Sequence, residues 1–205
     1  MSVSAEDRAR RIKIILFDVD GVLTDGTIWV YPMPVAQPDG SIATRVVEAK
    51  GFSAHDGAGI TLARLGGMKI GVITKRISDT VAIRARDLKL EFVYQGQAIK
   101  MHAVREIAEK AAVTLDQIAY VGDDVIDLPV MREVGLAIAV ANARAQVKAE
   151  AHYVTPNSGG YGAGRDAIEF ILAAQGSLEK CLAASIDESN PVSASMDIGK
   201  GGDLQ

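Results

Sequence analysis

Two aspartates separated by one residue, Asp18 and Asp20, follow directly on an apolar run in the segment Phe17-Asp18-Val19-Asp20-Gly21-Val22. Residues two apart on an extended chain project to the same side, so the two carboxylates would share one small space. Like charges this close raise one pKa unless a cation is present, and Mg²⁺ prefers oxygen ligands of this kind. The alternative is a pair of solvated turn formers or a helix N-cap.

Three further clusters complete a set suited to phosphoryl transfer. Gly122-Asp123-Asp124-Val125-Ile126-Asp127 could supply a third metal ligand, although an acidic helix start more often serves capping and dipole compensation. Thr74 offers a hydroxyl to a phosphoryl oxygen and is followed by the cations Lys75 and Arg76, while Lys100 lies near the start of a helical segment. A nucleophile, a metal ion and cations on the equatorial oxygens are what phosphoryl transfer requires.

All four clusters lie beside short apolar runs that alternate with helical segments. Runs typical of buried parallel strands occur at residues 12–17, 69–74, 91–94, 118–121, 136–140 and 152–154. Helical spacing occurs between them, at residues 57–65, 78–88, 98–112, 126–134 and 143–149. This order predicts an α/β fold with a doubly wound, mostly parallel sheet and ligands at the carboxyl ends of its strands. Both acidic clusters would converge on that edge.

Two segments depart from the alternation. Residues 27–31 and 41–48 are rich in β-branched types and flank a turn region with several prolines, which predicts a β-hairpin with a long tip. Residues 176–205 have few large apolar groups, and we predict a flexible tail there. The predicted organisation is an N-terminal arm at 1–11, one domain at 12–175 with a flap at about 27–48, and the tail.

Composition restricts the partners and the compartment. A length of 205 residues suits one domain with a proper core. The net charge of -4 argues against nucleic acid or an anionic membrane as a partner, while local cations could still bind a small anion. Cys181 is the sequence's one cysteine and cannot form an intramolecular disulfide. With no signal peptide or membrane span in the sequence, we expect a cytoplasmic protein.

The four clusters, in their order and at strand ends, match the motifs of the haloacid dehalogenase-like phosphatases, and the sequence resembles that family. Longer matches resemble its small, nearly capless branch, which hydrolyses 3-deoxy-D-manno-octulosonate 8-phosphate (KDO 8-phosphate). These matches are at residues 18–26, 94–100, 122–131, 139–140 and 159–166. The resemblance extends from residue 12 to about residue 176. It implies a Rossmann-like core, a small hairpin flap and no large cap domain.

The resemblance also implies a division of catalytic roles. Asp18 would attack phosphorus and form an aspartyl-phosphate, and Asp20 would protonate the leaving oxygen and then activate water. A covalent intermediate of this kind splits one difficult displacement into two easier ones. Thr74 and Lys100 would hold the phosphoryl group.

The implied cofactor is Mg²⁺. Its ligands would be the Asp18 carboxylate, the Asp20 main-chain carbonyl and Asp123, with Asp124 or Asp127 supporting the ligands from behind. The implied partners are an acidic sugar phosphate as substrate and further copies of the chain in a homotetramer, in which a neighbour's flap helps to close each site. The resemblance places the reaction in lipopolysaccharide biosynthesis.

The sequence departs from this branch in residues expected to bind the substrate. The branch usually has Thr-Gly-Arg where this chain has Thr74-Lys75-Arg76, and Tyr161 replaces an arginine of the glycine-rich segment, whereas Arg165 remains. We expect Lys75, Arg76 and Arg165 to contact the substrate, with Lys75 offering a replacement for the missing cation.

Three alternatives stay open. The substrate could be a nonulosonate 9-phosphate or another sugar phosphate. The domain could be a non-catalytic oligomerisation module of the kind joined to sugar-nucleotide synthetases, or a phosphoacceptor receiver domain. Retention of Asp18, Asp20, Thr74, Lys100 and Asp123 favours the enzyme.

Overall fold

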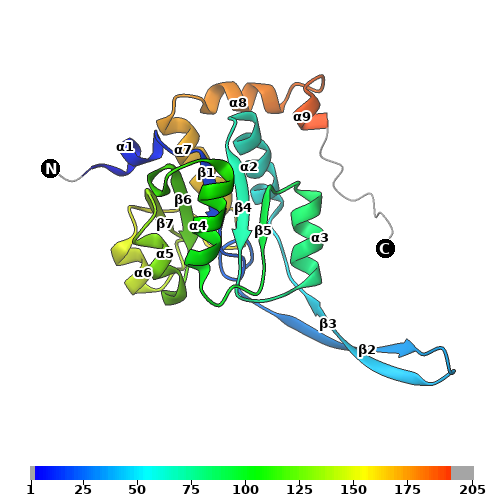
Figure 1. The fold of residues 1–205 in the computed structure, drawn as a ribbon. Coiled ribbons are helices and arrows are strands. Elements are labelled where there is room, and N and C mark those ends of the chain that lie inside the picture. Colours follow the sequence, from blue (N-terminus) through cyan, green and yellow to red (C-terminus); the bar gives the residue numbers. More distant parts are fainter. Residues whose placement is uncertain (1–2, 195–205) are drawn as a thin grey trace.

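The computed structural model describes residues 3–194 and has a parallel sheet at its centre (Figure 1). The six strands lie in the order β5-β4-β1-β6-β7-β8, and all neighbouring pairs are parallel. Their bounds are Ile14–Phe17 (β1), Lys69–Ile73 (β4), Phe92–Tyr94 (β5), Ile118–Gly122 (β6), Leu136–Ala139 (β7) and Tyr153–Val154 (β8). The predicted strands and the predicted α/β fold class are therefore confirmed.

The register of the central strands brings the polar clusters to one edge. Phe17 of β1 is aligned with Val72 of β4 on one side and with Val121 of β6 on the other. Asp18 is therefore level with Ile73 and Gly122, the last residues of β4 and β6, and Thr74 and Asp123 follow directly. All three side chains thus lie at the carboxyl edge of the sheet. All four residues of β1 are buried, which fits a strand covered on both faces.

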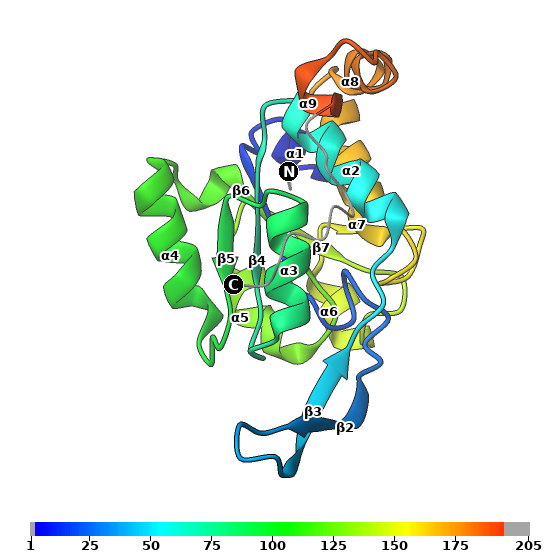
Figure 2. The same cartoon turned by 90° about the vertical axis from the view of Figure 1, so that its right-hand side faces the viewer.

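Helices cover both faces of the sheet. Figure 2 shows α4 (Lys100–Ala111) on one side, and α2 (Ala54–Leu65) with α7 (Ala163–Ala174) on the other. The remaining predicted helices are α3 (Asp79–Asp87), α5 (Leu128–Met131, after a 3-10 turn at Val125–Asp127) and α6 (Ala145–Glu150). The structure adds α1 (Ala5–Ala9), α7, α8 (Leu178–Ser185) and α9 (Pro191–Ala194), which the sequence analysis did not predict.

The predicted start of the tail at residue 176 is wrong, because α8 packs against α2 at the end of the molecule opposite the hairpin (Figure 1). Leu178, Cys181 and Leu182 face the core at the spacing of one helical stripe, and Cys181 is buried. That burial holds the segment on the domain. The rest of the predicted tail, residues 195–205, lies outside the described residues.

The predicted hairpin is confirmed and extends away from the sheet (Figures 1 and 2). It consists of β2 (Trp29–Ala36) and β3 (Ile42–Ala49), paired antiparallel with Trp29 opposite Ala49. All residues of β2 are exposed. No large cap is present among residues 3–194.

No described helix combines the length and the apolar character needed to span a lipid bilayer.

Candidate active site

Lys100 joins two buried carboxylates at the carboxyl edge of the sheet. It is the first residue of α4, and its Nζ lies 2.9 Å from Asp18 Oδ1 and 2.7 Å from Asp127 Oδ1. It also donates to the Tyr120 hydroxyl at 3.0 Å, and that hydroxyl donates to Asp127 Oδ1 at 2.7 Å. Burial alone would lower the pKa of Lys100, but the carboxylates of Asp18 and Asp127 raise it above the ordinary value. A charged lysine is therefore held beside Asp18.

Three carboxylates converge on one small space at this edge. Asp18, Asp123 and Asp127 each offer an oxygen, and these oxygens lie within 4.8 Å of one another. Burial, followed by the charges of Asp127 and Asp18, raises the pKa of Asp123 to about 7. Burial likewise raises the pKa of Asp18 to about 6, despite the opposing effect of Lys100.

A divalent cation fits this cluster. Asp123 Oδ1 is buried and has no hydrogen-bond partner among the described residues, which leaves a carboxylate oxygen unsatisfied in the protein alone. Mg²⁺ binds such oxygens and offsets the repulsion between the carboxylates, which adds to the effect of burial on their pKa values. The donor set therefore suits Mg²⁺.

Asp127 holds the loop that carries Asp123. Its Oδ2 accepts the backbone N–H of Asp123 at 3.1 Å and that of Asp124 at 3.4 Å, and its side chain is fully buried. Asp124 lies outside the three-carboxylate cluster. Its carboxylate accepts the N–H of Val125 at 2.7 Å and caps the short turn that follows.

Gly21 leaves the space that Asp123 occupies. Its φ is +93°, and a Cβ there would lie 2.2 Å from Asp123 Oδ2. We expect Gly21→Ala to displace Asp123 and weaken Mg²⁺ binding about 10-fold or more, measured by titration calorimetry. Gly40→Ala is the matched control, since Gly40 has φ +82° and only open space around the corresponding Cβ. Equal losses of Mg²⁺ affinity in both variants would contradict this role of Gly21.

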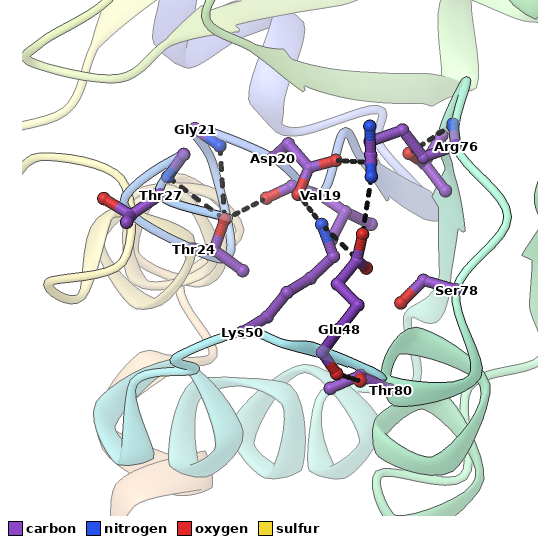
Figure 3. A network of polar contacts seen from close by, with 12 residues as sticks. Val19, Asp20, Gly21, Thr24, Thr27, Glu48, Lys50, Arg76, Ser78 and Thr80 are labelled. Carbon is purple, nitrogen blue, oxygen red and sulfur yellow. Dashed lines mark hydrogen bonds and ion pairs between the residues drawn. The ribbon is translucent and has the colours of Figure 1, made fainter. Parts of the chain in front are cut away.

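Asp20 is paired with a different set of cations (Figure 3). Its Oδ1 forms an ion pair with Lys50, and its Oδ2 lies 3.8 Å from Arg76 Nε. The expectation that Asp18 and Asp20 share one space is therefore corrected. The chain turns immediately after Asp18, so the alternation of an extended strand does not continue to Asp20.

The hairpin supplies two residues of this second cluster that the sequence analysis missed. Glu48 and Lys50 lie at the base of the hairpin, where Glu48 Oε2 pairs with Arg76 at 2.5 Å. Their positions depend on how the hairpin meets the sheet edge, and no local pattern in the sequence reports that contact. Tyr120 was also missed, although a hydroxyl in a buried strand requires a partner and could have indicated a polar site.

The other predicted site residues have separate surroundings. Thr74 is buried at the end of β4, and its Oγ1 accepts the N–H of Arg76 at 3.4 Å. Lys75 is exposed. Arg165 donates through Nε to Glu169 at 2.7 Å, and the structure brings it into neither carboxylate cluster.

Asp56 connects α2 to the start of α7. Its Oδ1 accepts the N–H of Arg165 at 2.9 Å, in the first turn of a helix whose N-cap, Gly162, has no side chain to offer. Burial raises the pKa of Asp56 to about 6, against the opposing effect of the N–H groups of Arg165 and Gly164. A carboxylate from another helix thus replaces the local cap.

The raised pKa of Asp56 has a defined effect on stability. Ionisation is less favourable in the folded state than in the unfolded chain, so the stabilising contribution present at low pH is lost as the pH rises through about 6. Asp56→Asn should gain stability relative to wild type between about pH 4 and 6, by at most about 3 kcal/mol in urea unfolding. Asp39→Asn, on the exposed hairpin turn, should show no such gain. A pH-independent difference for Asp56→Asn would contradict the assignment.

Known proteins resemble this chain in sequence and in fold. The profile of the haloacid dehalogenase-like hydrolases matches residues 71–162. The 3-deoxy-D-manno-octulosonate 8-phosphate phosphatase of Escherichia coli K12 is 38% identical over 179 residues, which are 87% of this chain and 89% of that protein.

Solved structures agree with these sequence matches. The Yersinia pestis 3-deoxy-D-manno-octulosonate 8-phosphate phosphatase is 38% identical with a TM-score of 0.75, over 85% of this chain and 88% of that one. The Moraxella catarrhalis enzyme, in complex with a magnesium ion, a phosphate ion and KDO, is 35% identical with a TM-score of 0.76, over 87% and 96% of the two chains.

Proposed function

This chain belongs to the haloacid dehalogenase-like hydrolases, and from that membership we propose that it is a Mg²⁺-dependent phosphomonoesterase that hydrolyses KDO 8-phosphate to KDO and phosphate. The observation that carries the proposal is the convergence of Asp18, Asp123 and Lys100 at the carboxyl edge of the sheet. The relative with magnesium, phosphate and KDO bound supports both the metal and the substrate.

The reaction proceeds in two displacements on phosphorus. A carboxylate oxygen of Asp18 attacks the phosphorus, the ester bond to the sugar oxygen breaks, and Asp20 gives that oxygen a proton. In the second displacement a water molecule gives its proton to Asp20 and attacks the aspartyl-phosphate, which releases phosphate and restores the Asp18 carboxylate.

The groups around Asp18 hold the phosphoryl oxygens. Lys100, at 2.9 Å from Asp18 Oδ1, is close enough to contact a phosphoryl group bound to that side chain, and Thr74 presents its hydroxyl from the neighbouring strand. Asp18, the Asp20 carbonyl and Asp123 would hold Mg²⁺, which would supply positive charge to offset that of the phosphoryl oxygens. Asp127 keeps both Lys100 and the Asp123 loop in place.

The remote part of the substrate has room beside the hairpin. A cavity of about 400 Å³ lies between residues 45–48 of β3 and residues 77–80 at the start of α3. Arg76 adjoins it through its ion pair with Glu48, and Lys75 is exposed nearby in sequence. These two cations suit an acidic sugar; Arg165, paired with Glu169, is the weaker candidate.

We also propose a cytoplasmic homotetramer in which the hairpin of a neighbouring copy helps to close each active site. Apolar side chains of the hairpin are largely in solvent in the single chain, with Trp29 at 56% and Ile42 at 75% exposure. Such a surface favours a protein partner. Light scattering of the full chain tests the assembly, and a monomer at micromolar concentration would refute it.

A phosphate-release screen with Mg²⁺ tests the activity and the substrate together. The panel contains KDO 8-phosphate, a nonulosonate 9-phosphate and neutral hexose phosphates. We expect the eight-carbon keto-acid phosphate to give the highest kcat/KM. A preference for the nine-carbon compound or for neutral hexose phosphates would refute KDO 8-phosphate as the substrate but retain the phosphatase activity. Phosphate release from none of the compounds would support the non-catalytic alternative.

A further inference from the structure

Asp20 and three other charged side chains form a closed ring of alternating sign (Figure 3). Lys50 pairs with Asp20, Asp20 lies 3.8 Å from Arg76, Arg76 pairs with Glu48 at 2.5 Å, and Glu48 lies 3.5 Å from Lys50. Two members come from the hairpin base, one from the loop after β1 and one from the loop after β4.

Lys50 is the most sequestered member of the ring. Its side chain has no exposed surface, whereas that of Asp20 is 20% exposed and that of Arg76 is 48% exposed. A buried ammonium group requires partners on the protein, and Lys50 has two carboxylates. Of the described residues, Lys50 alone donates a hydrogen bond to the Asp20 carboxylate.

We propose that Lys50 is a positioning residue for Asp20, which fixes Oδ1 and leaves Oδ2 as the atom that carries the proton. The proposal rests on the proposed function. Oδ1 is engaged by the ammonium group, while Arg76, at 3.8 Å, is beyond hydrogen-bond distance from Oδ2. Oδ2 can therefore face the leaving oxygen in the first displacement and the attacking water in the second.

Anchoring of the hairpin is a role that other contacts already fill. The Thr80 hydroxyl donates to the Glu48 carbonyl at 3.0 Å and ties β3 to α3 independently of Lys50. The full β2–β3 pairing from Trp29–Ala49 to Ala36–Ile42 is also independent of it. What Lys50 adds to these contacts is its hydrogen bond to the Asp20 carboxylate.

A comparison of kcat/KM for two leaving groups distinguishes a positioning role of Lys50 from a structural one. The value of kcat/KM includes the steps up to phosphoryl transfer to Asp18. Release of a sugar alkoxide needs a proton from Asp20 in that step, whereas release of p-nitrophenolate does not. Loss of Asp20 positioning should therefore lower kcat/KM for the sugar phosphate and spare it for p-nitrophenyl phosphate.

The experiment compares wild type with Lys50→Met, Lys50→Arg, Glu48→Gln and Asp20→Asn on p-nitrophenyl phosphate and on the best sugar phosphate of the panel. Lys50→Met should lower kcat/KM about 10- to 100-fold for the sugar phosphate and less than about 3-fold for p-nitrophenyl phosphate. Lys50→Arg should show the same selectivity with a smaller loss. Asp20→Asn should show it most strongly, and Glu48→Gln, which leaves the Lys50–Asp20 pair intact, should not show it.

A second readout is the aspartyl-phosphate, which should accumulate with p-nitrophenyl phosphate in Lys50→Met because its hydrolysis needs Asp20 as a base. Lys110→Met, which removes an exposed ion pair with Glu106 on α4, is the control and should change neither readout.

Equal losses of kcat/KM on both substrates in the two Lys50 variants would overturn the proposal and indicate a structural role. Should Lys50→Met fail to fold, Lys50→Arg decides by the same ratio. A wild type inactive on every phosphate ester would refute the proposed function itself.

Discussion

Asp18→Asn is expected to lower phosphate release by about 10³-fold or more, because an amide cannot attack phosphorus and no aspartyl-phosphate can form. The fold should survive, since asparagine has nearly the same size and Lys100 keeps its 2.7 Å contact with Asp127. Burial raises the pKa of Asp18 to about 6, so removal of its charge also removes an unfavourable ionisation.

Acid-quenched reactions with ³²P-labelled substrate measure the intermediate directly, beside initial rates of phosphate release. Labelled protein should appear with wild type and be absent with Asp18→Asn. Asp116→Asn is the control, since Asp116 lies before β6 at the opposite edge of the sheet and should retain wild-type rates. Equal rates or equal labelling in wild type and Asp18→Asn would rule out Asp18 as the nucleophile.

Asp123→Asn is expected to be more stable than wild type without Mg²⁺, to lose most of the stabilisation that Mg²⁺ gives wild type, and to lower activity about 100-fold or more. The folded-state pKa of Asp123, about 7, lies above its ordinary value because burial and the charges of Asp127 and Asp18 oppose ionisation. The stability that this group contributes at low pH is therefore lost as the pH rises through about 7. At pH 8 with a chelator present, Asp123→Asn should unfold at a higher temperature than wild type.

With Mg²⁺ present, wild type should again be more stable than Asp123→Asn, because the ion binds the wild-type carboxylates in the folded state alone. At a concentration of 100 times Kd it should stabilise wild type by about 2.7 kcal/mol and the variant by much less. Thermal unfolding with and without Mg²⁺ measures both effects. Equal Mg²⁺-induced shifts in wild type and Asp123→Asn would show that Asp123 does not bind the ion.

The polar residues around Asp18 could be predicted to lie together because the ends of the strands can be identified in the sequence. Asp18, Thr74 and Asp123 each follow a short apolar run, and a parallel register brings such positions to one edge. Lys100 also follows from its position at a helix start. The roles assigned to these residues remain predictions that the experiments above address.

The cluster around Asp20 and the start of α7 depend on contacts between distant parts of the chain. Lys50 reaches Asp20 because the hairpin base docks on the sheet edge, which no local pattern reports. The start of α7 is capped by Asp56 from α2, so the usual Ser, Thr, Asp or Asn signal is absent at Gly162. The apolar spacing of α8 was present in the sequence, but the surrounding small and polar residues outweighed it in the prediction of a tail.

Because β2 and β3 pair in a regular antiparallel register, the length of the hairpin can change while its base stays the same. Trp29 and Val30 pair with Ala49 and Glu48, next to Lys50, whereas the turn lies six register pairs or more beyond them. Excision of facing residues from the two strands in equal numbers would shorten the arm and keep every remaining pair in register. Natural relatives or designed variants could thus alter which surfaces the hairpin contacts, while Lys50 keeps its ion pairs with Asp20 and Glu48 at the hairpin base.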